Sequence, residues 1–380
     1  MTIQIKEVTS KRALKQFVNF PYRLYADCPY WVPSIRTNVF NTLYWEKNPA
    51  FSYCKAKYWL AYKKGKIVGR IAGILNPRFE ERFERRYARF GWFDFIDDPD
   101  VSSALLKTVE DWAIEEGQDA IHGPLGFTNL DPEAMLVEGF DEVATLAASY
   151  HYPYYQEHMQ QAGYGKDTDY VEFEIQVPDE PVEKISKLAK IVAKRNNLHM
   201  LKAKNRKDLL RFAPQIFDVM EEAYQHYGVT PLTHAQVDDY IDQYLGIIAP
   251  KFVPVVLDEN EKMVAFGIAM PSLSKAMQKN KGRLYPFGFA PVLKALRKND
   301  KADLYLIAIR PSYQGMGINA MLMAHMLDVF HTMGIRSVES NPELEDNYRV
   351  QAQWKHFETR QHKRRRIFIK HFVSSQDPTS

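Results

Sequence analysis

The sequence predicts an α/β (α+β) fold that is built twice, as two similar halves within one chain. Three observations support this prediction. Each half contains the alternating pattern of a β-hairpin, each hairpin is followed by an amphipathic helix that ends at a glycine, and each helix leads into a short apolar strand. We expect each half to form a mixed, mostly antiparallel sheet flanked by helices, because 380 residues are enough for two cores.

The first element in each half is the hairpin. Alternating apolar residues flank the turn Lys63–Lys66 in the first half and the turn Asp258–Glu261 in the second half. The strand after each turn carries a glycine followed by small apolar residues, at Gly69 and at Gly267. Polar turn residues between two alternating runs are typical of antiparallel strand pairs, so both segments are predicted to be hairpins.

The helix and strand after each hairpin align on two glycines, Gly117 and Gly334. Apolar residues recur at helical spacing before each glycine, which is predicted to end its helix. The strands that follow end at His122 and at Glu339, and a helix with a closing strand completes each half. Chance alignment of common α/β patterns is the alternative to a true repeat.

The boundary between the halves is predicted at residues 176–184, which contain two prolines and three acidic residues. We therefore expect an N-terminal domain at residues 1–178 and a C-terminal domain at residues 185–373. Residues 374–380 are polar and are predicted to be a frayed tail.

The composition excludes several classes of protein. The net charge of +3 is too small to indicate a nucleic-acid partner. Two cysteines, Cys28 and Cys54, give neither a disulfide framework nor the spacing of metal ligands, so we expect no metal and a reducing compartment. No apolar run approaches the roughly 20 residues that span a bilayer, and the start lacks the apolar segment of a signal peptide. A cytoplasmic location is the expectation.

A glycine-containing turn in the second half carries the strongest functional signal. The stretch IRPSYQGMGINAML, residues 309–322, places two glycines between a predicted strand and a predicted helix. Free N–H groups at a helix N-terminus bind anions, and glycine lets an anion approach the backbone closely. The turn lacks the third glycine of the dinucleotide fingerprint and the Gly-Lys-Ser/Thr of the Walker turn. We therefore expect the turn to bind the phosphate group of a ligand without cleaving it.

These residues resemble the coenzyme A turn of the GNAT acyltransferase superfamily, in which Gln/Arg-x-x-Gly-x-Gly/Ala links a strand to a helix. Gln314 and Gly317 match this motif, whereas Asn319 departs from its last position. The resemblance implies tandem acyl-CoA N-acyltransferase-like domains, with acetyl-CoA or a longer acyl-CoA as co-substrate. It implies pyrophosphate binding by the turn and pairing of pantetheine with the preceding strand. The residues implied are Leu306, Ala308, Ile309, Gln314, Gly315, Met316, Gly317, Ile318, Asn319 and Ala320.

The same resemblance suggests the catalytic groups. Glu339 ends the strand beside the cofactor strand and is our candidate for the general base; a structural acid is the alternative. The family commonly has an acidic tyrosine in an Asn-x-x-Ala-x-x-Leu-Tyr stretch. Here Asn347 matches, but Trp354 stands at the position of the tyrosine, and an indole is no usable acid. Tyr348, Tyr305 or a water molecule is the candidate substitute, and Tyr348 is the one assigned to the site.

The first half lacks the binding turn. Its equivalent, FDFIDDPDVSS, has no glycine, and its carboxylates at residues 97–100 would repel a pyrophosphate. We expect this half to be a degenerate domain that supplies a wall of the site or a scaffold. The long Gly/Pro-containing loop 121–140 is either a functional loop or a structural excursion, and it resembles a loop of a two-domain branch thought to N-acylate lipid amines.

A basic stretch interleaved with apolar residues, residues 272–298, is predicted between the second hairpin and the cofactor strand. It is either a lipid-facing insert, which would allow contact with the inner membrane face, or a cover near the coenzyme A phosphates.

The sequence thus predicts an acyl-CoA-dependent N-acyltransferase whose primary-amine acceptor attacks directly. The acceptor is a small metabolite, an amino sugar, a peptide or a sphingoid-type lipid amine. Two rival hypotheses are a non-catalytic coenzyme A-binding or acyl-CoA-binding regulatory protein and an aminoacyl transferase that uses charged tRNA. The small net charge argues against the latter.

Overall fold

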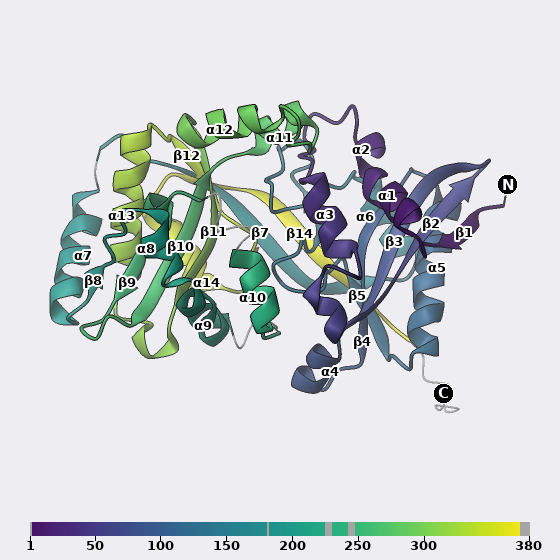
Figure 1. The fold of residues 1–380 in the computed structure, drawn as a ribbon, viewed down its shortest axis with the longest axis horizontal. Helices are drawn as coiled ribbons and strands as arrows, with labels where there is room; N and C mark the ends of the chain where they lie inside the picture. The colour runs from purple at the N-terminus through teal and green to yellow at the C-terminus, as the bar shows by residue number, and fades with distance from the viewer. Residues whose placement is uncertain (1, 181, 225–229, 242–247, 373–380) are drawn as a thin grey trace.

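The computed structural model describes residues 2–180, 182–224, 230–241 and 248–372. Within this part of the chain, two groups of helices and strands lie side by side and share one long mixed sheet (Figure 1). The predicted α/β class and the tandem arrangement are confirmed.

The strands of the described residues are β1 (Gln4–Glu7), β2 (Lys55–Lys63), β3 (Lys66–Leu75), β4 (Tyr87–Phe95), β5 (Ala120–Gly123), β6 (Met135–Glu138), β7 (Gly165–Gln176), β8 (His199–Met200), β9 (Val255–Leu257), β10 (Met263–Pro271), β11 (Lys301–Ile309), β12 (Ser337–Glu339), β13 (Glu343–Leu344) and β14 (Thr359–His371).

The α-helices of the same residues are α1 (Lys11–Asn19), α2 (Pro21–Leu24), α3 (Arg36–Leu43), α4 (Pro77–Phe83), α5 (Pro99–Glu115), α6 (Tyr154–Gln161), α7 (Glu183–Arg195), α8 (Arg206–Leu210), α9 (Ala213–Tyr224), α10 (His234–Tyr240), α11 (Ser274–Asn280), α12 (Phe289–Arg297), α13 (Asn319–Met333) and α14 (Tyr348–Gln351). None of them is long and apolar enough to cross a membrane.

Local residue chemistry explains the predicted elements. In the first hairpin, Lys64 and Gly65 have φ values of 52° and 73°, as the tight turn between β2 and β3 requires. Helix α13 ends at Gly334, whose φ of 70° places it in the left-handed region. Helix α5 begins after Asp98, whose side chain accepts a hydrogen bond from the backbone N–H of Asp100.

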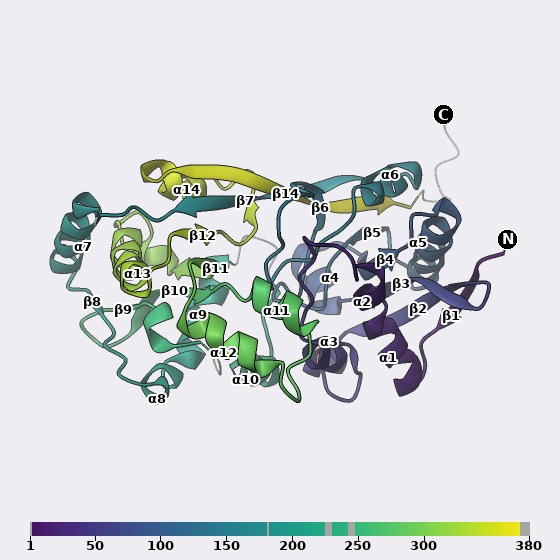
Figure 2. The ribbon, with the colours of Figure 1, turned by 90° about the horizontal axis from the view of Figure 1, so that it is seen from above.

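The closing strands of the two halves exchange places in the sheet. The strand order is β1-β2-β3-β4-β5-β14-β7-β12-β11-β10-β9-β8, so β14 of the second half lies beside β5 and β7 of the first half lies beside β12. Strands β7 and β14 run antiparallel to each other and span both halves, along the upper edge of the view in Figure 2. The domain boundaries at residues 178 and 185 remain a prediction, but each half's sheet is completed by a strand of the other half.

The apolar cores follow the same plan. Phe90 and Phe93 are buried in the core of the first half, and Phe252 and Phe266 in that of the second half. Tyr25 from the first half is buried in the second core. The two halves are therefore joined by shared packing as well as by the sheet.

Candidate active site

The turn after β11 has the geometry of an anion site. Gly315 and Gly317 have φ values of 78° and 83°, which glycine adopts without strain. Among the described residues, the backbone N–H groups from Gly315 to Asn319 donate no hydrogen bond, and they precede the first turn of α13. The side chain of Gln314 donates to the carbonyl oxygen of Ile309 at 3.2 Å, which closes the turn. Free N–H groups at a helix N-terminus fit a pyrophosphate.

In the first half, the place that corresponds to this turn is occupied by acidic side chains of the first half itself. The carboxylate of Asp98 caps α5 and forms an ion pair with Lys63. The hydrogen bond from Lys63 holds the pKa of Asp98 below its usual value, so the group is an anion. The neighbouring Asp97 lies 3.0 Å from Nε2 of His158. These carboxylates occupy the place where an anionic ligand would bind.

Strand β11 leaves the sheet open beside the turn. It pairs with the parallel strand β12 only from Lys301 to Asp303, and its remaining residues pair with β10 alone among the described strands. The register with β10 also shifts, because Ile268 lies opposite Leu306 and Ala269 lies opposite Leu304. Tyr305 lies at this shift, and a β-bulge of this kind bends the strand and locally disrupts its pairing.

A cavity of about 280 Å³ lies along this open edge of β11. Its wall is mostly apolar and comes from β11, α9, α13 and the segment around α14. The apolar lining includes Met220, Leu304, Leu306, Leu322, Met326, Phe330 and Phe357. The loop after β5 in the first half also reaches the cavity, with Asn129, Leu130 and Glu133. The two halves therefore build one site together.

Polar atoms without partners gather at the same cavity. Among the described residues, the buried atoms Asn129 Oδ1, Glu133 Oε2, Thr230 Oγ1, Glu343 Oε2 and Gln353 Oε1 have no hydrogen-bond partner, and all five residues line the cavity. Buried polar groups are normally hydrogen-bonded, so such a cluster requires an explanation. A ligand with a polar end would supply the missing bonds.

Glu343 is held by the tryptophan that replaces the family's tyrosine. The indole Nε1 of Trp354 donates to Glu343 Oε1 at 2.9 Å. Burial raises the pKa of Glu343 to about 7, so the carboxyl group can hold or release a proton near neutral pH. Trp354 itself cannot transfer a proton, but it orients a group that can.

Glu133 is a second buried carboxyl group at the cavity whose pKa is raised. Burial raises its pKa to about 7, and the nearby Arg89 opposes this rise. The loop that carries it is fixed by Asp131, which accepts hydrogen bonds from the N–H groups of Phe127 and Thr128. The sequence indicated this loop but did not single out Glu133, because one acid in a long loop gives no periodic signal.

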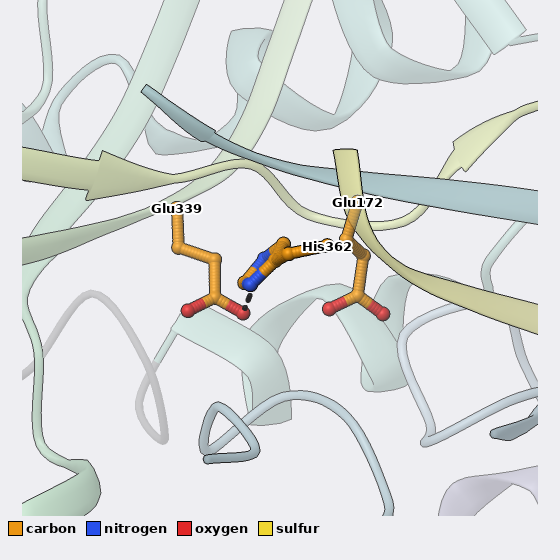
Figure 3. Close-up of side chains that lie close together, drawn as sticks. All are labelled: Glu172, Glu339 and His362. Carbon is orange, nitrogen blue, oxygen red and sulfur yellow. Dashed lines mark ion pairs between the residues drawn. The ribbon is translucent and has the colours of Figure 1, made fainter. Parts of the chain in front are cut away.

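Glu339 lies at the end of β12, where it was predicted, but it has a cationic partner. Its carboxylate forms an ion pair with Nζ of Lys363, and Nε2 of His362 lies 3.5 Å from Oε1 (Figure 3). A register shift between Gln361 and Lys363 interrupts the pairing of β14 with β7 at this point. Ser340, one residue further on, lines the cavity, whereas Glu339 does not.

Glu172, Glu339 and His362 lie close enough together to hold a metal ion, with ligand atoms within 4.8 Å of one another (Figure 3). Two cations already contact these carboxylates. Arg365 bonds Glu172, and Nζ of Lys363 lies 3.5 Å from Glu172 Oε2. Burial alone would raise the pKa of Glu172, but Arg365 and Lys363 hold it below its usual value. The cluster is thus a buried ion-pair network that joins β7 to β14.

Removal of the charge of Glu172 should destabilise the fold. In Glu172→Gln, Arg365 and Lys363 lose a buried counter-charge, and breaking such a pair costs about 3–5 kcal/mol. Urea denaturation at pH 7 measures the loss. Glu183→Gln is the control, because the Glu183–Lys187 pair is exposed on α7 and contributes less than about 1 kcal/mol. Equal losses for both variants would show that the network does not hold the crossed strands.

The other predicted residues are distributed differently. Asn347 lines the cavity, and its side chain accepts a hydrogen bond from the N–H of Val350 at the start of α14. Tyr348 is 74% exposed and does not line the cavity. Leu306 of β11 lies in the cavity wall, and the turn residues 314–319 lie beyond it. No observation tests the roles of these residues, which remain proposals.

Comparison with known proteins shows what this chain is similar to. Residues 215–357 match the model of the Acetyltransferase (GNAT) family. This part of the second half is similar to a GNAT domain. The whole chain has the tandem GNAT fold, because it resembles a tandem GNAT protein from the clavulanic acid biosynthesis pathway over 99% of this chain and 100% of that one. The TM-score is 0.56 at 9% identity.

Two relatives match almost the whole of this tandem GNAT chain. Protein YghO of Escherichia coli is 28% identical over 374 residues, which are 96% of this chain and 95% of the relative. A protein named bacterial ceramide synthase, from Caulobacter vibrioides, is 25% identical over 358 residues, 91% of each chain. The match to the GNAT family model agrees with the predicted enzyme class, an N-acyltransferase of the GNAT type.

Proposed function

We propose that this GNAT protein transfers an acyl group from acyl-CoA to the primary amine of an apolar, lipid-like acceptor of the sphingoid type. The observation that carries the proposal is the apolar cavity beside the open edge of β11, in which the polar atoms without partners gather. The name of the Caulobacter relative, which matches 91% of this chain, also favours a lipid acceptor.

The residues present fit coenzyme A. The free N–H groups from Gly315 to Asn319 would hold the pyrophosphate, and a side chain added at Gly315 would meet nothing within 4 Å, so the turn is open. The open edge of β11 from Leu306 to Ile309 would pair with the pantetheine amides. A bound acyl-CoA supplies an activated carbonyl carbon and a thiolate leaving group.

The apolar wall of the cavity favours a hydrocarbon chain over a polar acceptor. Burial of aliphatic surface is favourable by roughly 25 cal/mol per Å². A polar acceptor such as an amino sugar would leave its hydroxyl groups without partners against residues such as Leu304, Met326 and Phe330. The polar atoms of the lining suffice for one amine end and the reacting group.

Glu133 and Glu343 are each assigned one of the two proton transfers of the reaction. We assign Glu133 Oε2 as the base that accepts the amine proton, because it enters the cavity from the first half, away from the coenzyme A turn. We assign Glu343 Oε2 as the acid that protonates the departing sulfur, because the carboxyl group lines the cavity and is bonded by Trp354, which stands at the tyrosine's position in the sequence motif.

Glu339 and Tyr348 remain alternative proposals for these roles. Glu339 is the weaker base candidate, because its carboxylate is already paired with Lys363. Tyr348 is the weaker acid candidate, because its side chain is exposed and lies outside the cavity lining. The cytoplasmic location predicted from the sequence also remains a proposal.

Thermal-shift titration with coenzyme A, acetyl-CoA and palmitoyl-CoA tests the proposal. A ligand that binds only the folded state stabilises it by RT ln(1 + [L]/Kd), about 2.7 kcal/mol at 100 times Kd. We expect all three ligands to raise Tm and palmitoyl-CoA to act at the lowest concentration. No shift with any ligand would refute coenzyme A binding. If acetyl-CoA and palmitoyl-CoA raised Tm at the same concentration, the result would refute a cavity that binds the acyl chain.

One observation favours a second function, an acyl-CoA-binding regulatory protein. Trp354 replaces the tyrosine that donates a proton in the family, as would be expected after loss of catalysis. The two functions differ in turnover. Release of free coenzyme A thiol in the presence of acyl-CoA and a sphingoid amine, followed with a thiol reagent, would occur only with the enzyme.

A further inference from the structure

The segment that joins β10 to β11 contains α11, α12 and the loop between them. We call residues 274–298 the basic insert. Its two helices lie along the upper edge of the molecule in Figure 1, outside the shared sheet. Helix α12 has no buried residue. Val292, Ala295 and Leu296 are partly buried against the second core, so packing of the fold explains only one face of this helix.

Apolar side chains project from the basic insert into solvent. Tyr285 is 82% exposed and Phe287 is 80% exposed, and both lie in the loop between α11 and α12. Phe289 and Leu293 of α12 are 44% and 46% exposed. A cluster of large exposed apolar residues in one short segment indicates a surface that is covered in use.

The charges of the same segment have one sign. The basic insert contains no acidic residue and seven basic ones, Lys275, Lys279, Lys281, Arg283, Lys294, Arg297 and Lys298. All seven are exposed, and none forms an ion pair within the described residues. Such a surface attracts an anionic partner and repels a second copy of itself.

The basic insert is held firmly by the first half. The side chain of Gln278 donates to the carbonyl oxygens of Pro29 and Trp31 at 2.7 and 3.1 Å. Ser274 Oγ donates to the carbonyl oxygen of Ala144 at 2.9 Å, and the N–H of Arg36 donates to Gly282. The exposed aromatic side chains therefore stand on a fixed support, which lowers the entropy cost of docking.

We propose that the basic insert docks on the surface of a bilayer that contains anionic phospholipids, with Tyr285 and Phe287 entering the interface. Exposed aromatic residues flanked by lysine and arginine are the combination that binds such a surface, because the rings enter the headgroup region while the cations bind phosphate. This docking is independent of the proposed reaction, although it would bring the cavity to a membrane-borne acceptor.

Sedimentation of the full chain with vesicles tests the docking. The vesicles are phosphatidylcholine alone or phosphatidylcholine with phosphatidylglycerol, without acyl-CoA, so that failure here leaves the proposed reaction untouched. We expect binding to the anionic vesicles that weakens as salt rises. Lys279→Gln/Lys281→Gln/Arg283→Gln should weaken it by roughly a hundredfold, since each of the three cations contributes roughly a fivefold step.

The aromatic residues are tested with a matched pair of variants. Tyr285→Ser/Phe287→Ser should weaken binding to anionic vesicles by roughly tenfold or more. The control is Leu188→Ser/Ile191→Ser on α7, which removes two exposed apolar side chains from another basic helix and should leave binding unchanged. Equal losses for the two double variants would overturn the proposal. So would salt-independent binding to neutral vesicles, or sedimentation without vesicles, which would indicate self-association.

Discussion

Glu343→Gln should lower kcat by about 10²–10⁴-fold while leaving the affinity for coenzyme A unchanged. The range is the usual contribution of a positioned acid or base. Glutamine keeps the hydrogen bond from Trp354 to the side-chain oxygen but cannot release a proton. Release of coenzyme A thiol measures kcat, and calorimetric titration measures affinity. Wild-type turnover by Glu343→Gln would remove this residue from the mechanism.

The pH profile separates the two carboxyl groups. Glu343 as the acid must be protonated and Glu133 as the base must be ionised, and both have a pKa raised to about 7 by burial. We therefore expect kcat/KM to form a bell with its maximum near pH 7. Glu343→Gln should remove the decrease of kcat/KM above pH 7. Glu133→Gln should remove the decrease of kcat/KM below pH 7. The opposite result would exchange the two roles.

The same variants should be more stable than the wild type at pH 8. The unfolded state releases the carboxyl protons near pH 4.5, whereas the folded state retains them to about pH 7. The folded state thus binds more protons in this window, and its stability falls as pH rises from 4.5 to 7. A neutral glutamine avoids the penalty of a buried charge, on the order of 1–3 kcal/mol. Thermal denaturation at pH 5 and pH 8 measures the difference.

This combination of lower activity and higher stability distinguishes catalytic carboxyl groups from structural ones. Glu172→Gln is the comparison, because Glu172 is ionised and paired with Arg365, so its loss should reduce stability at pH 8. A fall in stability for Glu133→Gln or Glu343→Gln at this pH would show that these residues support the fold and not the reaction.

Gly315→Asp should weaken coenzyme A binding by roughly 30-fold relative to Gly315→Asn. Both side chains tolerate a positive φ better than other residues do, and the space around Gly315 is open, so the two variants should fold alike. They differ in one negative charge, which repels a pyrophosphate a few ångströms away by about 2 kcal/mol. Calorimetric titration of the two variants measures the ratio.

A pantetheine titration completes this test. Pantetheine lacks the pyrophosphate, so its affinity should be the same for Gly315→Asp and Gly315→Asn. If the charge weakens both ligands equally, the turn affects binding through the fold and not through the phosphates. If it weakens neither, the phosphates are bound elsewhere.

The sequence by itself determined the elements and the glycine turn after β11. The hairpin at Lys63–Lys66, the helix end at Gly334 and the turn around Gly315 each depend on the conformational preferences of a few adjacent residues. Such local preferences can be read without knowledge of the rest of the chain. The contrast with Asp98 in the first half could be predicted for the same reason.

Only the tertiary structure decided which side chains meet at the cavity. Glu133 and Glu343 are separated by most of the chain and come together because β13 pairs with β7 and the loop after β5 reaches across to the second half. The exchange of β7 and β14 also brings Lys363 to Glu339, which the sequence had presented as a free base. Strand partners are chosen by long-range packing and hydrogen bonding, and these leave no local pattern in the sequence.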